Sequence, residues 1–249
     1  MQRSFPARTK LLSDMAEPLR LRHELKYYIS FSQYEVLRRM LAATLNPDPH
    51  ADENNEYHIR SLYFDTVFDS ALNEKIAGVS RRDKYRIRIY NLSDAVINME
   101  CKSKYDTLIS KRSTRISRLV SEQIIATDPS GLENTSSGLL RDVFREMRLN
   151  FLHPVVIVDY VREAYLHPAE DIRITFDKQL RTGLNSIDLF NKNVPTIPVF
   201  PHETIILEVK FNRTLPPYIS NILSLAAGWS TRSAISKYTF CRQYEGKSF

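Results

Sequence analysis

The stretch Lys84-Tyr85-Arg86-Ile87-Arg88-Ile89-Tyr90 decides the fold, because apolar and basic residues alternate along it. Successive side chains of a β-strand point to opposite faces of the sheet. As a strand, the stretch would place Tyr85 and the two isoleucines on one face, and the lysine and the two arginines on the other. The pattern therefore predicts a strand with one apolar face and one cationic face.

Three further segments, 21–28, 98–104 and 204–211, alternate in the same way. Each polar face holds a glutamate among basic residues. The residues of these faces are Arg22, Glu24, Lys26 and Tyr28; Glu100, Lys102 and Lys104; and Glu208 and Lys210. An antiparallel sheet with its polar face in water is the ordinary explanation for one or two such strands.

The charge balance of the polar faces favours a binding site over a solvated surface. With Lys111, Arg162, Arg173 and Asp177 from other strand-like segments, the faces hold eleven basic and four acidic residues. A solvated face mixes the two signs more evenly. We therefore expect the sheet to curve around a tunnel that binds a polyanion, with the apolar faces packed against outer helices. This assignment depends on parity, because a slip of one residue exchanges the two faces.

Length and composition indicate a globular protein with a substantial core. The chain has 249 residues, of which 43% are hydrophobic, and a net charge of +6. Its basic residues are dispersed, unlike those of a nucleic-acid-binding tail. Cys101 and Cys241 lack the spacing of a disulfide scaffold or zinc site. No segment reads as a signal peptide or membrane span, so we expect a cytoplasmic protein without direct membrane insertion.

The periodicity predicts an α+β fold, an antiparallel sheet with flanking helices. Residues 1–19 are expected to form a loose arm, and residues 20–249 a single domain. The expected strands are 20–29, 57–65, 83–91, 95–104, 109–118, 155–166, 171–177 and 203–211. The expected helices are 32–45, with Ser32 as N-cap, 67–76, 119–126, 139–149, 216–227 and 232–244.

The polar faces suit phosphate chemistry. Arginine matches phosphate oxygens in a bidentate manner, and lysine supplies a compact charge. Phosphoryl transfer needs mainly positioning and charge stabilisation, with one or two carboxylates for Mg²⁺ or Mn²⁺. Glu24, Glu100 and Glu208 are the candidate metal ligands. Each glutamate has an equally plausible alternative role as a salt-bridge partner that separates basic residues.

Several common catalytic motifs are absent from the sequence. There is no GxxxxGK[ST] loop, no HExxH pair and no GxSxG elbow. His23 and Cys101 both fall on the apolar parity. We interpret His23 as a packed or surface residue and Cys101 as a core residue.

An ordered set of short motifs resembles a known family. In chain order they are Arg22-His23-Glu24-Leu25-Lys26-Tyr27, Ser61-Leu62-Tyr63-Phe64-Asp65-Thr66, Lys84-Tyr85-Arg86-Ile87-Arg88, Glu100-Cys101-Lys102, Arg173-Ile174-Thr175-Phe176-Asp177, Glu208-Val209-Lys210 and Ser236-Lys237-Tyr238. Over about residues 20–244 this set resembles the VTC domain, the polyphosphate-polymerising domain of the vacuolar transporter chaperone complex. That domain belongs to the CYTH-like, triphosphate tunnel metalloenzyme superfamily.

The resemblance implies a closed tunnel of eight antiparallel strands. It also implies transfer of the γ-phosphate of ATP to a polyphosphate chain, with Mn²⁺ or Mg²⁺ as cofactor. The residues that it assigns to catalysis are Lys26, Arg86, Arg88, Lys102, Glu208 and Lys237. To substrate binding it assigns Lys111, Arg162 and Arg173, and to the metal Glu208, beside the candidate ligands Glu24 and Glu100. Strand parity adds Arg22, Lys84, Lys104 and Lys210 as further substrate contacts. Tyr160 shares the face of Arg162, where it would either donate a hydrogen bond to phosphate or pack.

Arg22 replaces the first glutamate of the superfamily's E-x-E-x-K motif. This exchange favours a longer anionic substrate over simple triphosphates. The chain also lacks the SPX domain and membrane segments of eukaryotic subunits, so we expect a stand-alone prokaryotic-type member, with any membrane coupling through a partner chain.

The leading hypothesis is an ATP-dependent polyphosphate polymerase acting on ATP and polyphosphate or pyrophosphate. The alternatives are a metal-dependent hydrolase of triphosphate or nucleoside triphosphates, and a non-catalytic module that binds polyphosphate or inositol phosphates. Nucleic-acid binding is disfavoured, because aromatic platforms are not interleaved with the basic residues.

Overall fold

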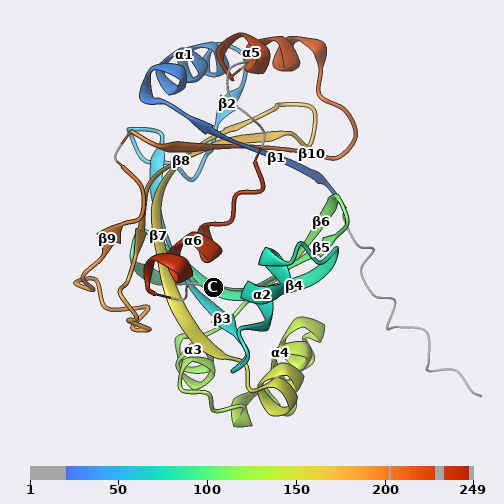
Figure 1. The fold of residues 1–249 in the computed structure, drawn as a ribbon, viewed down its shortest axis with the longest axis vertical. Helices are drawn as coiled ribbons and strands as arrows, with labels where there is room; N and C mark the ends of the chain where they lie inside the picture. Colours follow the sequence, from blue (N-terminus) through green and yellow to red (C-terminus); the bar gives the residue numbers. More distant parts are fainter. Residues whose placement is uncertain (1–20, 202, 228–232, 247–249) are drawn as a thin grey trace, which may run out of the picture.

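The computed structural model describes residues 21–201, 203–227 and 233–246. An antiparallel sheet curves round on itself, with helices outside it at both ends of the long axis (Figure 1). The long strands are β1 (His23–Ile29), β3 (Glu56–Asp65), β4 (Arg81–Tyr90), β5 (Ser93–Tyr105), β6 (Leu108–Arg115), β7 (His153–Leu166), β8 (Arg173–Thr182) and β10 (Ile205–Phe211). The helices are α1 (Phe31–Ala42), α2 (Ser70–Ile76), α3 (Arg118–Ile125), α4 (Gly138–Asn150), α5 (Pro217–Ala227) and α6 (Lys237–Tyr244), with a short 3₁₀ turn at Ser130–Leu132.

The long strands follow the order β1-β10-β8-β7-β3-β4-β5-β6, and every pairing is antiparallel. Two-residue strands β2 (Asn46–Pro47) and β9 (Ile197–Pro198) add to β7 and β8. The predicted α+β fold on an eight-strand antiparallel sheet is confirmed. The expected continuous closure is not found, because β1 and β6 meet only at one bridge, where Arg22 and Ile109 exchange two backbone hydrogen bonds of 3.0 Å.

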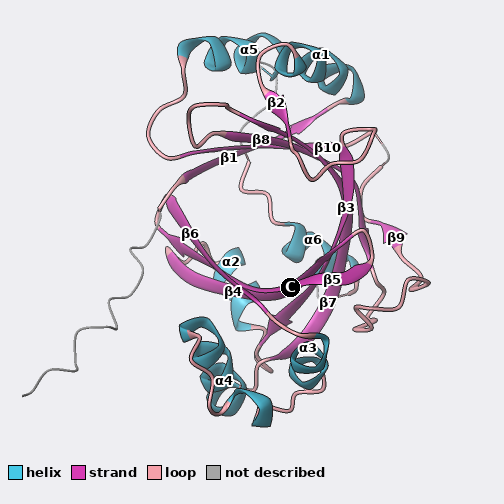
Figure 2. Ribbon diagram, turned by 180° about the vertical axis from the view of Figure 1, so that it is seen from behind, coloured by secondary structure: helices cyan, strands magenta, loops and turns pink. Residues whose placement is uncertain are grey.

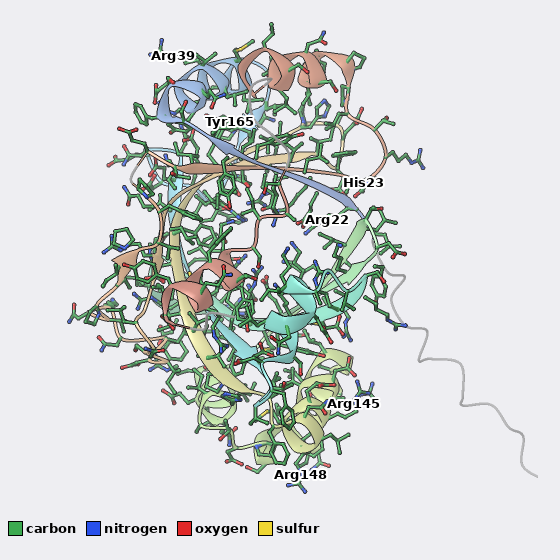
Figure 3. The ribbon with its side chains drawn as sticks, in the orientation of Figure 1. Arg22, His23, Arg39, Arg145, Arg148 and Tyr165 are labelled. Atoms are coloured by element: carbon green, nitrogen blue, oxygen red, sulfur yellow. The ribbon has the colours of Figure 1, made fainter. Side chains whose placement is uncertain are left out.

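Outer helices cover the apolar faces of the sheet at two places (Figure 2). The α3 and α4 helices pack against β4 and β5, where Ile87, Met99 and Cys101 are fully buried. The α1 and α5 helices pack against β1, β8 and β10, with Leu37 and Leu207 in the shared core. The outer helix surfaces carry charged side chains such as Arg39, Arg145 and Arg148 (Figure 3). The predicted parity of β4 and the core position of Cys101 are therefore confirmed.

The start of α1 corrects one prediction. The Oγ of Ser30 accepts a hydrogen bond from the backbone N–H of Gln33 at 3.3 Å, and Gln33 Oε1 accepts from the N–H of Ser30 at 2.9 Å. This reciprocal capping box makes Ser30 the N-cap in place of Ser32. The helix therefore begins earlier than predicted, at Phe31.

Other details follow the sequence with small shifts. His23 stacks on Phe211 with ring centroids 5.1 Å apart, as expected of a packed residue. The last helix begins at Lys237, after the N-cap Ser236. The predicted loose arm, the first predicted strand residue and the predicted start of the last helix at 232 lie outside the described residues. Among the helices that the structure describes, none is long and apolar enough to cross a membrane.

A pair of substitutions in β4 tests the assignment of its two faces. We expect Ile87→Ala to lower the free energy of unfolding by about 2–5 kcal/mol, because Ile87 is fully buried against the outer helices. The matched change Lys84→Ala, on the other face of the same strand, should leave stability unchanged or raise it. Urea unfolding of both variants measures the difference, and equal losses would contradict the assignment.

Candidate functional site

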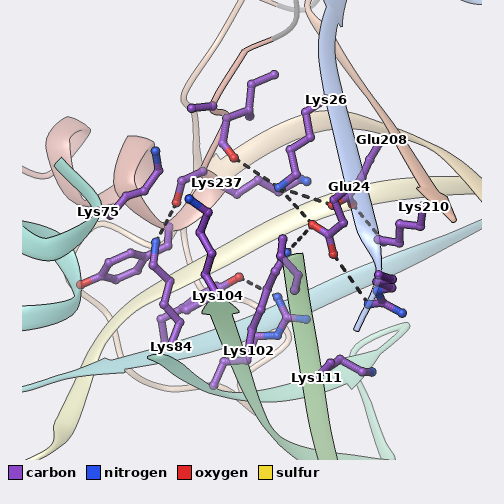
Figure 4. A pocket seen from close by; sticks show the side chains of 18 of the residues that line it. Glu24, Lys26, Lys75, Lys84, Lys102, Lys104, Lys111, Glu208, Lys210 and Lys237 are labelled. Carbon is purple, nitrogen blue, oxygen red and sulfur yellow. Dashed lines mark hydrogen bonds and ion pairs between the residues drawn. The ribbon is translucent and has the colours of Figure 1, made fainter. Parts of the chain in front are cut away.

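The polar strand faces line a cavity of about 520 Å³ on the inner side of the curved sheet (Figure 4). Strands on every side of the sheet contribute, together with α2 and residues 233–238. All sequence-predicted site residues except Glu100 lie on its wall. They are Arg22, Glu24, Lys26, Lys84, Arg86, Arg88, Lys102, Lys104, Lys111, Tyr160, Arg162, Arg173, Glu208, Lys210 and Lys237.

The register of β1 with β10 places opposite charges directly across from each other. Lys26 pairs with Glu208, and Glu24 pairs with Lys210. The Nζ of Lys26 lies 3.4 Å from Glu208 Oε1, and the Nζ of Lys210 lies 3.0 Å from Glu208 Oε2. Burial alone would raise the pKa of Glu208, but Lys210 and Lys26 hold it well below its usual value. Burial lowers the pKa of Lys210 to about 7, although Glu208 opposes this shift.

Glu24 is the second buried carboxylate on the cavity wall. Its Oε2 lies 2.6 Å from the Nζ of Lys102 and 3.9 Å from that of Lys26. Its Oε1 lies 3.7 Å from Arg22 Nη2 but has no hydrogen-bond partner among the described residues. One carboxylate oxygen is therefore buried without a donor, facing a group of cations. Buried carboxylates normally accept hydrogen bonds or coordinate metals.

Glu100 lies behind the cavity wall. Its Oε2 lies 2.6 Å from Arg86 Nη2 and 3.8 Å from Arg88 Nη1, and its Oε1 accepts a hydrogen bond of 2.9 Å from Lys111. Burial would raise the pKa of Glu100, yet Arg86, Arg88 and Lys111 hold it well below its usual value. Of the three glutamates predicted as metal ligands, Glu100 is the one that does not line the cavity, and its carboxylate holds the two arginines in the wall.

Asp177 fixes two further cations from different parts of the chain. Arg162 binds both of its oxygens, at 2.6 and 2.8 Å, in a bidentate pair across β7 and β8. The Nζ of Lys237, at the start of α6, lies 2.5 Å from Asp177 Oδ2. Burial would raise the pKa of Asp177, but Arg162 and Lys237 together hold it below its usual value. Asp177 thus ties α6 to the sheet and holds Lys237 at the cavity.

Tyrosines from β3 and β7 support the arginines. The hydroxyl of Tyr160 accepts a hydrogen bond of 3.1 Å from Arg88, and the Nζ of Lys237 lies 4.9 Å from its ring centroid. The hydroxyl of Tyr63 accepts a hydrogen bond of 2.7 Å from Arg86. Burial would raise the pKa of Tyr63, but Arg86 and Arg88 outweigh it and lower the value. Tyr160 therefore acts as an acceptor and a packing surface in this structure.

Arg173 is held from outside its own strand. Its Nη2 donates hydrogen bonds of 2.6 Å to Asp48 Oδ2 and to the hydroxyl of Tyr57. Asp48 follows the short strand β2, which sequence periodicity does not reveal. These contacts fix the guanidinium at the cavity wall, although its Nε has no hydrogen-bond partner among the described residues.

The segment 233–238 crosses the inner side of the sheet and includes the first two residues of α6. The N–H of Ser233 donates to the backbone oxygen of Lys26 at 3.0 Å, and the Nζ of Lys26 donates to the backbone oxygen of Ile235 at 3.2 Å. The Nζ of Lys84 donates to Ser236 Oγ at 3.1 Å. Figures 1 and 2 both show α6 on the inner side of the sheet. Two lysines of the cavity are therefore bound to neutral oxygens of this segment.

Sequence reasoning missed several lining residues. Arg82 lies two residues before Lys84 in β4 and so shares its face. The alternation of this strand could therefore have predicted it. Lys75 comes from α2, where the period of two does not apply. Tyr57 and Tyr63 come from β3, whose burial on both faces removes the alternation that marked the other strands.

At the described part of the wall, a metal ion would take ligands from a substrate as well as from the protein. Among residues 21–201, 203–227 and 233–246, no group of three or more histidine, cysteine or acidic side chains could bind one. Glu24 and Glu208 are two carboxylates on neighbouring strands, and the unpartnered Oε1 of Glu24 is a suitable ligand. Mg²⁺ is commonly bound by one or two carboxylates together with substrate phosphates. These two residues therefore fit a divalent cation that a phosphate ligand brings with it.

Fold and site together define a class of protein, a curved antiparallel sheet whose cationic inner wall suits a phosphate polyanion. A comparison with protein-family models matches residues 21–244 to the VTC domain. The chain therefore belongs to the VTC domain family, and the resemblance inferred from the ordered motifs is confirmed.

Two other comparisons add little. No curated protein matches the chain. Among solved structures, a candidate adenylate cyclase from Vibrio parahaemolyticus is 13% identical over 89% of this chain and 97% of its own, with a TM-score of 0.49. One from Bacillus halodurans is 13% identical over 84% and 92%, with a TM-score of 0.46. Likenesses of this size carry no argument about the present protein.

The environment of Glu100 predicts a pH-dependent stability. Glu100→Gln leaves Arg86 and Arg88 without their buried counter-ion and should cost about 3 kcal/mol near neutral pH. The folded-state pKa of Glu100 lies below its ordinary value of 4.5, so its contribution is present above that value and is lost as the pH falls through the folded-state pKa. Thermal unfolding should show the deficit at about pH 7 and a smaller one at about pH 3. Exposed Glu133 supplies the control, Glu133→Gln, and an equal deficit at both pH values would contradict the assignment.

Proposed function

We propose that the protein is an ATP-dependent polyphosphate polymerase, which transfers the γ-phosphate of ATP to the end of a polyphosphate chain inside the cavity. One observation carries this proposal beyond the family assignment: fourteen basic side chains and only three acidic ones line a single cavity. Such an excess suits a ligand with many consecutive negative charges. It exceeds what a single phosphate or carboxylate could offset.

The reaction needs charge stabilisation and positioning more than covalent chemistry. A terminal oxygen of the chain attacks the γ-phosphorus of ATP, the bond from that phosphorus to the β,γ-bridging oxygen breaks, and ADP leaves. The product chain is longer by one phosphate. Because the attacking oxygen is already anionic, the step needs no general base from the protein.

The side chains on the wall have distinct tasks in this proposal. Arg86 and Arg88, held by Glu100, present guanidinium groups to the equatorial oxygens of the transferred phosphate. Lys26 and Lys102 supply point charges near the two wall glutamates. Lys237, held by Asp177, contributes a charge from the C-terminal helix. In this proposal, all five side chains would stabilise the charge that develops on the transferred phosphate.

A divalent cation is part of the proposal. Glu24 and Glu208 would hold Mg²⁺ or Mn²⁺ together with phosphate oxygens, and the ion would supply Lewis-acid stabilisation of phosphate charge. Lys26, Lys102 and Lys210 compensate the same carboxylates in the ligand-free protein. When a metal ion and phosphate bind together, the metal ion would therefore replace lysines as the counter-ion of these carboxylates. The net charge at the wall would then change little.

Product analysis tests the proposed activity directly. Purified protein is incubated with ATP and Mn²⁺, with and without a short phosphate primer, and products are resolved on a polyphosphate-stained gel while free phosphate is measured. We expect a ladder that lengthens with time. Free phosphate without a ladder would assign the cavity to a hydrolase, in which water replaces the chain end. Neither product from a folded protein that binds polyphosphate would leave a binding module.

Glu208→Gln separates turnover from binding. The change removes a candidate metal ligand but keeps the side-chain volume, so metal-dependent turnover should fall by about 100-fold or more. Binding of tripolyphosphate without metal should be retained or tightened, because a negative charge leaves a cationic wall. Isothermal calorimetry and the product assay measure the two effects. Unchanged turnover in the folded variant would contradict a metal role for Glu208, and Glu133→Gln again supplies the control.

A further inference from the structure

The cations of the cavity fall into two groups that differ in their counter-ions. Cations around Glu24, Glu100, Glu208 and Asp177 all form ion pairs with carboxylates. Lys75, Arg82, Lys84 and Lys104 form a second group, here called the unpaired cluster. Among the residues that the structure describes, no member of this cluster has a carboxylate within ion-pair distance.

The strand register creates this cluster. Between β4 and β5, Arg82 lies directly opposite Lys104, and Lys84 lies opposite Lys102. Like charges in this position are destabilising. The next pair along the same two strands, Arg86 with Glu100, has opposite charges. Along one side of the cavity, the cross-strand pairs thus change within a few residues from opposite charges to like charges.

Neutral groups do not replace the missing counter-ions. Lys84 donates to Ser236 Oγ at 3.1 Å and lies 4.8 Å from the ring centroid of Tyr238. Arg82 donates to the backbone oxygen of Val79. Burial, followed by the neighbouring cations, lowers the pKa values of Lys75, Lys84 and Lys104.

Two acids, Glu74 and Asp106, act on the cluster without forming ion pairs with it. Burial lowers the pKa of Arg82, and Glu74 opposes this shift. Asp106, which lines the cavity, likewise opposes the lowered pKa of Lys104. Neither acid forms an ion pair with the cluster. The cluster therefore stores electrostatic repulsion that a bound anion would relieve.

The cluster and the glutamate-bearing part share one cavity. Figure 4 shows Lys75, Lys84 and Lys104 on one side of it, and Glu24, Glu208 and Lys210 on the other. Lys102 joins the two parts, because it binds Glu24 and lies opposite Lys84. A linear anion lying in the cavity could contact both groups, whereas a single phosphate could contact only one.

We propose that the unpaired cluster is a distal subsite for a linear condensed phosphate, which binds phosphates beyond those held near Glu24 and Glu208. The proposal rests on the proposed function for its ligand class. It implies that affinity rises with chain length past the triphosphate, because only longer chains reach the cluster. It also implies that free protein is stabilised when the cluster is neutralised.

The test compares two double variants with the same change in net charge. Lys75→Gln/Arg82→Gln removes half of the cluster, including the member that comes from α2. Lys192→Gln/Arg213→Gln removes two exposed cations that do not line the cavity. Binding is measured by calorimetry without metal or nucleotide, using tripolyphosphate and a linear polyphosphate several times longer, at two salt concentrations.

For the cluster variant we expect about a tenfold or greater loss of affinity for the long chain, with a shallower salt dependence, since fewer phosphates are neutralised. Tripolyphosphate affinity should stay within about twofold. The melting temperature without ligand should be unchanged or higher, because like charges are removed. The control variant should bind both anions almost as the native protein does.

Three results would overturn the subsite: equal losses for both anions, no loss for either, or losses matched by the control. Tighter binding of compact inositol hexakisphosphate than of the linear chain would overturn the linear ligand class. If single-stranded RNA competes with the long polyphosphate as well as polyphosphate itself does, the proposed ligand class would be overturned, because the cluster would then bind polyanions in general. The binding test measures no turnover, so it is independent of the product assay. If affinity rises with chain length but the product assay gives no ladder, the subsite is supported and the proposed polymerase activity is contradicted.

Discussion

Buried carboxylates are the constraint on which the rest of the site depends. A curved sheet that turns fourteen basic side chains towards one cavity would be strongly self-repelling without internal counter-ions. Glu24, Glu100, Asp177 and Glu208 each bind at least two cations and are almost completely buried. Two of them line the cavity and two lie behind its wall. The hidden pair can orient arginine and lysine side chains without presenting negative charge to a phosphate.

The arrangement has a cost that the outer cores offset. Removing charged groups from water is expensive, and ion pairs in the interior rarely return more than they lose. Apolar faces of the same strands supply the compensation, with Ile87 and Met99 under α3 and α4, and Leu207 under α1. Each strand thus contributes to stability through one face and to ligand chemistry through the other. This is why residues of one parity could be assigned to the site without a structure.

Alternation made most of the wall predictable from sequence, because a period of two shows which side chains share a face of the sheet. It could not reveal contributions that depend on other geometry. Lys75 comes from a helix, and Asp48 from the end of a two-residue strand. Tyr63 comes from a strand buried on both faces. The sequence also could not show that Glu100 lies behind the cavity wall. Strand parity places Glu100 on the same face as Lys102, but three cations hold its carboxylate beneath the cavity surface. The alternation also could not predict whether the sheet closes. The edge strands β1 and β6 meet only at the bridge of Arg22, and this depends on how the two strands diverge in space.

The segment 233–238 shows how the ligand-free site remains ordered. Its neutral oxygens accept hydrogen bonds from Lys26, in the compensated part, and from Lys84, in the unpaired cluster. Hydrogen bonds from lysine to neutral oxygens are weaker than those to phosphate, which are charge-assisted in both partners. An anion can therefore displace these contacts at modest cost, while the segment stays anchored through Lys237 and Asp177 and through the backbone bond of Ser233. The segment holds two lysines in place through neutral oxygens, so the contacts that an anionic ligand would replace carry no negative charge.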